Sequence, residues 1–186
     1  ELLQRTVRSL AKRSNLADAT IRLLPPALAG QVRTLTAAAR KLRRLAGGGR
    51  PKRLRTGKPE PLANLVSYYD AAQRRHGAAQ HYLAAINLVE TRFGRVKSDS
   101  VAGARGPMQF IPSTWRIYGG GGNIRDPHDA ILGAAHLLRD NGAPRSYSRA
   151  LYAYNPSRLY VGAVGLYAKL IERDPYAVHF LYAWGP

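Results

Sequence analysis

None of the aromatic side chains of this chain precedes Tyr68. All 11 Tyr, 3 Phe and 2 Trp residues lie in the remainder of the 186-residue sequence. Aromatic residues contribute large buried areas to protein cores and form many of the walls of ligand sites. The chain is therefore predicted to have two regions with different roles: an arm rich in Ala, Leu and Arg, followed by an aromatic-bearing core that can hold a ligand.

Positive charge is also concentrated in the first region. The formal net charge is +18, with 15 Lys and Arg against 3 acidic residues in residues 1–60, and 14 against 8 in residues 61–186. This excess is larger than solubility requires, and it indicates a polyanionic partner such as nucleic acid, acidic lipid headgroups or an anionic cell wall.

Composition excludes several classes of protein. The absence of Cys excludes a disulfide scaffold, a thiol nucleophile and thiolate metal sites. No apolar stretch is long enough to cross a membrane. The sequence begins at Glu1 without Met or a signal-peptide pattern, so we interpret it as a mature or trimmed chain.

Apolar spacing predicts helices in the arm. Apolar residues recur at intervals of three and four in residues 3–10, 17–24 and 28–45, and Gly47 closes the last run. Such narrow stripes, lined by Arg and Lys, are expected to pack on one another or across the main domain. The alternative is a basic amphipathic arm that rests on a membrane or wall. Arm and linker together span residues 1–61, and residues 47–61 have a linker composition.

The second region is also predicted to be helical. Asp126 before Pro127, and Ser157, are typical N-caps. No two-residue alternation indicates a sheet, so the fold class is all-α. The domain is predicted to span residues 62–175, and the aromatic tail, residues 176–186, to pack on it. The expected helices of the domain begin at Leu62 and end near Gly77, run from about Ala79 to Phe93 and from Pro112 to Tyr118, begin at Pro127 and end before Gly142, cover residues 150–154, and follow a Ser157 cap through Ile171.

Several catalytic motifs are absent. The five His show no metal-binding spacing, and neither a phosphate-binding loop nor a serine nucleophile motif occurs. We expect neither a metal nor a cofactor.

Glu90 stands out among the acidic residues. It is the only Glu between Glu60 and Glu172, and it lies near the end of the most apolar predicted helix. Partial desolvation there would raise its pKa and suit a general acid at neutral pH. The alternative is a structural helix-end Glu paired with Arg92 or Arg95.

Three motifs occur together with Glu90. They are Glu90-Thr-Arg-Phe-Gly94, a stretch from Ser100 to Trp115 that contains Gly-Pro-Met-Gln, and Ala153-Tyr-Asn155. In this order they resemble the bacterial lytic transglycosylases, with features of both the membrane-bound B type and the soluble type. The resemblance covers about residues 68–171 and leaves out the arm. It implies a lysozyme-like, all-α catalytic domain preceded by the basic helical arm.

The resemblance also implies roles for individual residues. Glu90 matches the catalytic acid, and Ser100 matches a Ser close to it. Met108 and Gln109 match the pair that lines the cleft, with Gln109 as the sugar contact. Tyr154 and Asn155 match the pair that orients the carboxyl and the substrate's acetamido group. Aromatic platforms for a glycan are expected among Phe110, Trp115, Tyr118, Tyr152 and Tyr154.

The implied activity is cleavage of the β-1,4 bond between N-acetylmuramic acid and N-acetylglucosamine in peptidoglycan, leaving 1,6-anhydro ends. The alternatives are a lysozyme-type hydrolase on the same fold and a non-catalytic wall-binding relative. We expect an exported monomer in the cell wall, periplasm or extracellular space, whose basic arm holds an anionic wall or membrane surface. A nucleic-acid partner would not explain the Glu90 motif set.

Overall fold

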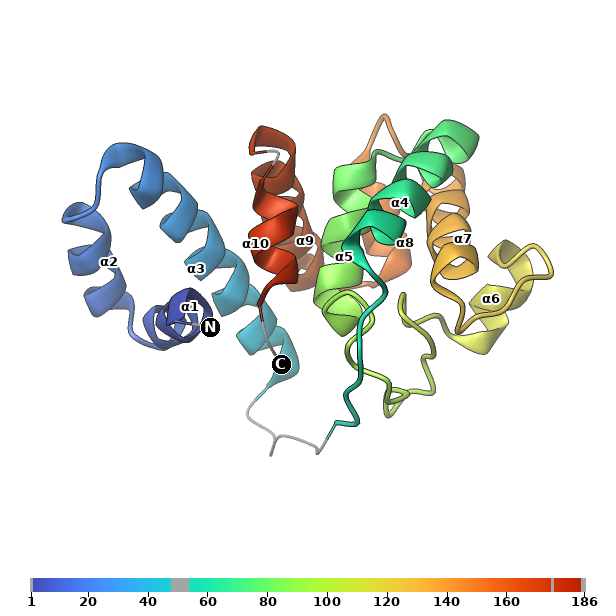
Figure 1. The fold of residues 1–186 in the computed structure, drawn as a ribbon, viewed down its shortest axis with the longest axis horizontal. Helices are drawn as coiled ribbons and strands as arrows, with labels where there is room; N and C mark the ends of the chain where they lie inside the picture. The colour runs from blue at the N-terminus through green and yellow to red at the C-terminus, as the bar shows by residue number, and fades with distance from the viewer. Residues whose placement is uncertain (1, 48–53, 175, 185–186) are drawn as a thin grey trace.

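The structure is a computed structural model, and it describes residues 2–47, 54–174 and 176–184 (Figure 1). Within these ranges ten helices form the fold and the only strand-like pairings are two isolated bridges, Thr56 with Val96 and Arg105 with Phe110. The all-α prediction is confirmed. The helices are α1 (Leu2–Lys12), α2 (Ser14–Arg22), α3 (Pro26–Ala46), α4 (Leu62–His76), α5 (Gln80–Thr91), α6 (Pro112–Tyr118), α7 (Pro127–Asp140), α8 (Tyr147–Tyr154), α9 (Arg158–Arg173) and α10 (Ala177–Tyr182).

The arm consists of α1, α2 and α3, and it packs in two ways. A small cluster of Leu10, Ala17, Ile21, Ala29 and Val32 holds the three helices together. Val7, Leu35 and Ala38 instead belong to the core of the main domain. The arm is therefore both self-packed and docked, and α3 lies between the other two arm helices and α9 (Figure 1).

A glycine lies where α3 crosses α9. The side chain of Lys41 crosses α9 at Gly162, where a Cβ atom would lie 3.0 Å from the Lys41 stem. At the other end of this interface, Gln31 Nε2 donates to the Asp174 carboxylate at 3.1 Å. Part of the predicted 47–61 linker, residues 48–53, and the predicted domain end at Pro175 lie outside the described residues.

The two predicted N-caps of the domain are confirmed. The Asp126 side chain accepts the Asp129 amide hydrogen, and Pro127 begins α7. The Ser157 hydroxyl accepts the Tyr160 amide hydrogen at the start of α9. The α8 helix begins earlier than predicted, at Tyr147, because the Ser146 hydroxyl caps it by accepting from the Arg149 amide.

The C-terminal aromatic segment forms a helix, α10, which packs on α5 and α9 with Ala177 and Leu181 buried. The Tyr182 hydroxyl donates to the Glu60 carbonyl at 2.9 Å, and the Arg95 guanidinium lies over the Tyr182 ring, 4.6 Å from its centroid. This helix thus connects the segment that precedes α4 with the chain that follows α5. No helix in the described part of the chain is long and apolar enough to span a membrane.

Candidate active site

The candidate site is centred on the end of α5. This helix is buried along most of its length, and it ends at Thr91 rather than at the predicted Phe93. The prediction was wrong here because Arg92, Phe93 and Gly94 all have left-handed backbone, with φ of 54°, 61° and 78°. Non-glycine residues adopt this conformation only where the surroundings enforce it. Such enforced backbone is concentrated at functional sites, and here it directly follows Glu90.

A buried polar network enforces this geometry. Asn87, which is fully buried, donates through Nδ2 to the Pro107 carbonyl at 2.9 Å and accepts from the Tyr69 hydroxyl at 2.8 Å. The Thr91 hydroxyl also donates to the Pro107 carbonyl, at 2.6 Å, and accepts the Gly94 amide hydrogen at 3.0 Å. The last turn of α5 therefore holds the loop that carries Met108 and Gln109.

The loop itself is tightly constrained. Gly106 has φ of 74°, and a Cβ atom there would lie 1.8 Å from the Ile124 carbonyl oxygen. Gln109 is the third non-glycine residue in the described chain with positive φ, at 49°. Both its main-chain N–H and its Nε2 donate to the Gly106 carbonyl, at 3.1 and 3.0 Å. Gln109 is thus fixed in place before any ligand binds.

Glu90 lies in the last turn of α5 and is partly buried. Burial raises the pKa of its carboxyl from the usual 4.5 to about 7. Tyr160, on α9, opposes this shift, because its hydroxyl favours the ionised carboxylate. A carboxyl with a pKa near neutrality can both donate and accept a proton at physiological pH, as a general acid and base must.

Two tyrosines surround this carboxyl. Tyr160 is 1% exposed. Its hydroxyl lies close enough to Glu90 to lower the pKa of that carboxyl, although the hydroxyl has no hydrogen-bond partner among the described residues. Burial raises the pKa of Tyr154, and the charge of ionised Glu90 raises it further. The two rings are parallel, with centroids 6.3 Å apart. Sequence analysis identified Tyr154 but missed Tyr160.

The Tyr154 hydroxyl has a different partner from the one expected. It donates to the Met108 carbonyl at 2.6 Å, so it holds the loop next to Gln109 rather than bonding to Glu90. Met108 was predicted to line the cleft, but its side chain is fully buried. Only its carbonyl serves the site. The aliphatic side chain fills the core because the Pro107 and Met108 backbone is turned toward α5 and α8.

The predicted platform Phe110 is also buried, at 3% exposed. Its ring packs against Trp115 and Tyr154, with centroid distances of 5.1 and 5.8 Å. Phe110 therefore supports other aromatic residues and does not offer a surface of its own. Among the five candidate platforms, Tyr152 is the one classed as exposed, at 50%.

Ser100 and Asn155 differ in how strongly they are engaged. The Ser100 hydroxyl accepts the Ala104 amide hydrogen at 2.9 Å and so closes a turn of the exposed loop. Asn155 is the C-cap of α8, and its side-chain amide has no hydrogen-bond partner among the described residues. The Asn155 amide can therefore receive a ligand, and the Ser100 hydroxyl, which accepts within its own loop, can still donate its hydrogen.

Gln109 borders a cavity of about 210 Å³ that Glu90 does not line. Phe93, Pro107 and Arg125 form other parts of its wall. The structure thus brings Glu90 together with Tyr154 and Tyr160, and places Gln109 on the adjacent loop.

Other acidic residues of the loops have structural partners. Asp99 accepts from Arg125 at 2.8 Å, which holds the pKa of that carboxyl below its usual value. Asp126 caps α7, and Asp129 accepts the Asn123 amide hydrogen at 2.8 Å. Asp126, His128 and Asp129 are close enough to share a cation, but the first of these is engaged as a cap and exposed acidic groups commonly lie together.

Comparison with known proteins identifies the domain. The family described as Transglycosylase SLT domain matches residues 67–169, more than half of the chain. The chain belongs to this family. The SLT match begins within α4 and ends within α9, so it contains Glu90, the Gln109 loop and Tyr160 but none of the arm. The predicted lytic transglycosylase-like, lysozyme-like domain is confirmed. Neither the curated proteins nor the solved structures contain a match to the chain.

Membership of the SLT family indicates the general function of the domain. An SLT domain implies a transglycosylase-type enzyme that binds peptidoglycan glycan strands, and the helical fold agrees with this family. The family match does not extend to α1, α2 and α3, and the packing of α3 on α9 is an addition to the SLT domain.

Proposed function

We propose that this protein is a lytic transglycosylase that cleaves the bond between N-acetylmuramic acid and N-acetylglucosamine in peptidoglycan and leaves 1,6-anhydro-muramyl ends. Glu90 is the single catalytic acid and base. Gln109 contacts the neighbouring sugar, and Asn155 contacts the acetamido group of the substrate. The buried Tyr160 assists Glu90 by stabilising its ionised form.

The observation that carries this proposal is the isolation of Glu90. Most glycosidases use two carboxylates on opposite sides of the scissile bond. Burial raises the pKa of Glu90, and among the described residues no second carboxylate is close enough to contribute to that shift. Asp99, Asp126 and Asp129 are each engaged elsewhere. One carboxyl must therefore perform both proton transfers.

The reaction can be written with Glu90 alone. The neutral carboxyl protonates the glycosidic oxygen while the bond from that oxygen to C1 of the muramic acid breaks. The acetamido oxygen of the same sugar stabilises C1. The Glu90 carboxylate then takes the proton of the sugar's O6 hydroxyl as O6 bonds to C1, which closes the anhydro ring and returns the carboxyl to its neutral form. Water takes no part.

The location and surface attachment of the protein are part of the same proposal. Its substrate lies outside the cytoplasm, so the protein is exported to the cell wall, the periplasm or the exterior, and it acts as a monomer. The arm surface carries exposed basic residues at Lys12, Arg13 and Arg44. These residues hold the enzyme on an anionic wall or membrane and raise its local concentration there.

A pair of variants tests the assignment of Glu90. Glu90→Gln removes the proton donor with little change in shape, and it should lower kcat on purified glycan strands by at least about 10²–10⁴-fold, the range of general acid–base catalysis. Asp99→Asn is the matched control, and it should retain most of the activity because Asp99 serves Arg125. A loss of similar size in both variants would indicate a two-carboxylate mechanism instead.

A further inference from the structure

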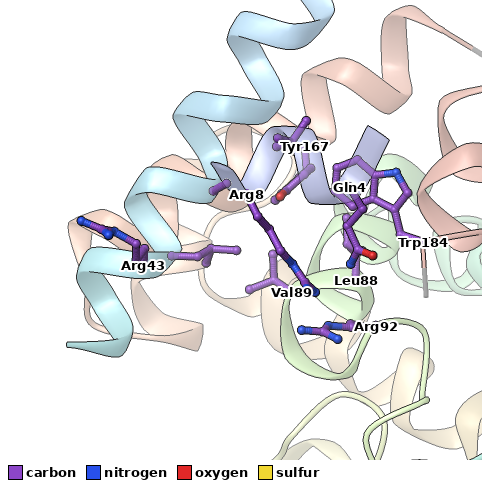
Figure 2. A pocket seen from close by; sticks show the side chains of 11 residues that line it. Gln4, Arg8, Arg43, Leu88, Val89, Arg92, Tyr167 and Trp184 are labelled. Atoms are coloured by element: carbon purple, nitrogen blue, oxygen red, sulfur yellow. The ribbon is translucent and has the colours of Figure 1, made fainter. Parts of the chain in front are cut away.

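A cavity of about 360 Å³ lies where the arm meets the end of α5. Its walls come from α1 and α3 on one side, and from α5, Tyr167 of α9 and Trp184 on the other (Figure 2). Because α1 and α3 lie outside the SLT match, this cavity is created by the docking of the arm and is not a feature of the SLT domain alone.

The charged residues that line this cavity are all basic. They are Arg8, Arg43 and Arg92, and no Asp or Glu belongs to the wall as the structure describes it. None of the three forms an ion pair with a carboxylate of the described residues. Figure 2 shows the guanidinium ends of Arg8 and Arg92 directed toward the same space, whereas Arg43 extends to one side.

This arrangement favours the binding of an anion. Burial lowers the pKa of Arg92, and the charges of Arg8 and Arg95 lower it further. Two guanidinium groups that face one space repel each other, and a carboxylate between them would accept hydrogen bonds from both.

Apart from Gln4 and the phenol of Tyr167, the rest of the wall is largely apolar. Val7, Leu42, Leu88 and Val89 line it together with the indole of Trp184. A ligand that matches both parts has a carboxylate attached to small apolar groups. A peptide rich in alanine has this character.

The cavity is within reach of the site around Glu90. Val89 and Arg92 flank Glu90 in the chain, and both line the cavity. On α9, Tyr160 lies beside Glu90 and Tyr167 lines the cavity, seven residues later on the same face of the helix. Two helical turns correspond to about 10 Å. An extended peptide of three residues covers about the same length.

We propose that this cavity binds a carboxylate of the peptide stem carried by the glycan strand that is cut at Glu90. The arm therefore contributes to substrate recognition through Arg8, with Arg92 as its partner on the SLT domain. This inference rests on the proposed function, since it takes the strand to be the substrate. It gives the enzyme a preference for strands that still carry their stem peptides.

The test compares two substrates with two variants of the full chain. Arg8→Gln removes one guanidinium from the cavity, and Arg5→Gln removes the same charge from an exposed position of α1 outside it. On strands with stem peptides, Arg8→Gln should lower kcat/KM about fivefold to tenfold through KM, the effect of one partly exposed charge-assisted hydrogen bond. On strands stripped of their stems, Arg8→Gln and Arg5→Gln should behave alike.

Equal behaviour of the two variants on stem-bearing strands would overturn the inference, as would an Arg8→Gln loss that is just as large on stripped strands. A binding measurement separates this result from the fate of the proposed function. A free alanine-containing stem tripeptide, titrated into the Glu90→Gln protein by NMR, should shift the signals of Trp184 and Val89, and Arg8→Gln should weaken its binding. If polyglycerol phosphate shifts the Trp184 and Val89 signals and the peptide does not, the cavity binds a phosphate polymer and the proposal is contradicted. If the parent protein cleaves neither the stem-bearing strands nor the stripped strands but the peptide binds in the cavity, the proposed function fails and the cavity assignment stands.

Discussion

The hydroxyl of Tyr154 donates a 2.6 Å hydrogen bond to the main-chain carbonyl of Met108, so the end of α8 holds the loop that presents Gln109. The same loop is held from the other side by Asn87 and Thr91 of α5, through the Pro107 carbonyl. Two consecutive carbonyls of one loop therefore bind two different helices, and Glu90 lies beside both anchors. This preorganisation places a glycan-contacting loop at a fixed distance from the acid.

Removal of the Tyr154 hydroxyl should loosen this loop. Tyr154→Phe leaves the Met108 carbonyl without its donor, and it should cost roughly 1–2 kcal/mol of stability and raise KM for glycan strands several-fold. Tyr152→Phe, on the same helix but exposed, is the control and should change neither quantity. Urea unfolding and steady-state kinetics measure the two effects, and identical results for both variants would show that this bond does not position the loop.

Two buried threonines provide a sharper test of the network. Thr91 makes the 2.6 Å bond to the Pro107 carbonyl, whereas the buried Thr36 hydroxyl has no partner among the described residues. Thr91→Val should lower the free energy of unfolding by about 2 kcal/mol, because it leaves buried polar groups unsatisfied. Thr36→Val should be neutral or stabilising, since it removes an unpaired polar group. The account is contradicted if the Thr36 variant is the less stable one.

Because burial raises the pKa of Glu90, ionisation of this carboxyl is predicted to lower the stability of the folded protein at pH values above 4.5. A carboxyl with a pKa near 7 in the folded state and 4.5 in the unfolded state binds more protons when folded between these values. Stability must then fall as the pH rises through this window. Glu90→Gln removes the effect, so it should stabilise the fold at pH 8 by up to roughly 3 kcal/mol and leave it nearly unchanged at pH 4.

Chemical denaturation of both proteins at the two pH values measures this difference. Activity should decline with increasing pH through the same region, because the reaction begins with neutral Glu90. A Glu90→Gln protein that is no more stable than the parent at pH 8 would show that the carboxyl is not desolvated.

The arm should unfold with the domain and not before it. Leu35 of α3 is 1% exposed and belongs to the main core, whereas Leu28 on the same helix is 42% exposed. Leu35→Ala should destabilise the whole chain by about 2–4 kcal/mol, and Leu28→Ala by less than about 1 kcal/mol. Hydrogen exchange followed on α3 and α9 distinguishes the cases: separate opening of α3 at lower free energy would make the arm an independent unit.

Much of the helical fold could be predicted from local signals. Asp126 with Pro127, Ser157 and Gly77 mark helix ends by their own chemistry, and the structure uses each of them. The end of α5 could not be predicted in the same way. Apolar periodicity runs on to Phe93, but the contacts of Thr91 with a loop 16 residues away stop the helix first.

The site was predicted from sequence only in part, for the same physical reason. Glu90 and Gln109 belong to contiguous motifs, so the family resemblance identified them. Tyr160 reaches Glu90 from a different helix, 70 positions later, and no spacing rule connects the two. Met108 and Phe110 were expected to face the ligand because they lie beside Gln109, but alternating burial along the loop turns both side chains into the core.

The most direct measurement of the central claim is mass spectrometry of the products formed from purified glycan strands in ¹⁸O-labelled water. If Glu90 alone performs both proton transfers, the new ends are 1,6-anhydro-muramyl residues and contain no ¹⁸O. Reducing ends that carry ¹⁸O would show that water attacks C1, and would make the protein a lysozyme-type hydrolase on the same fold.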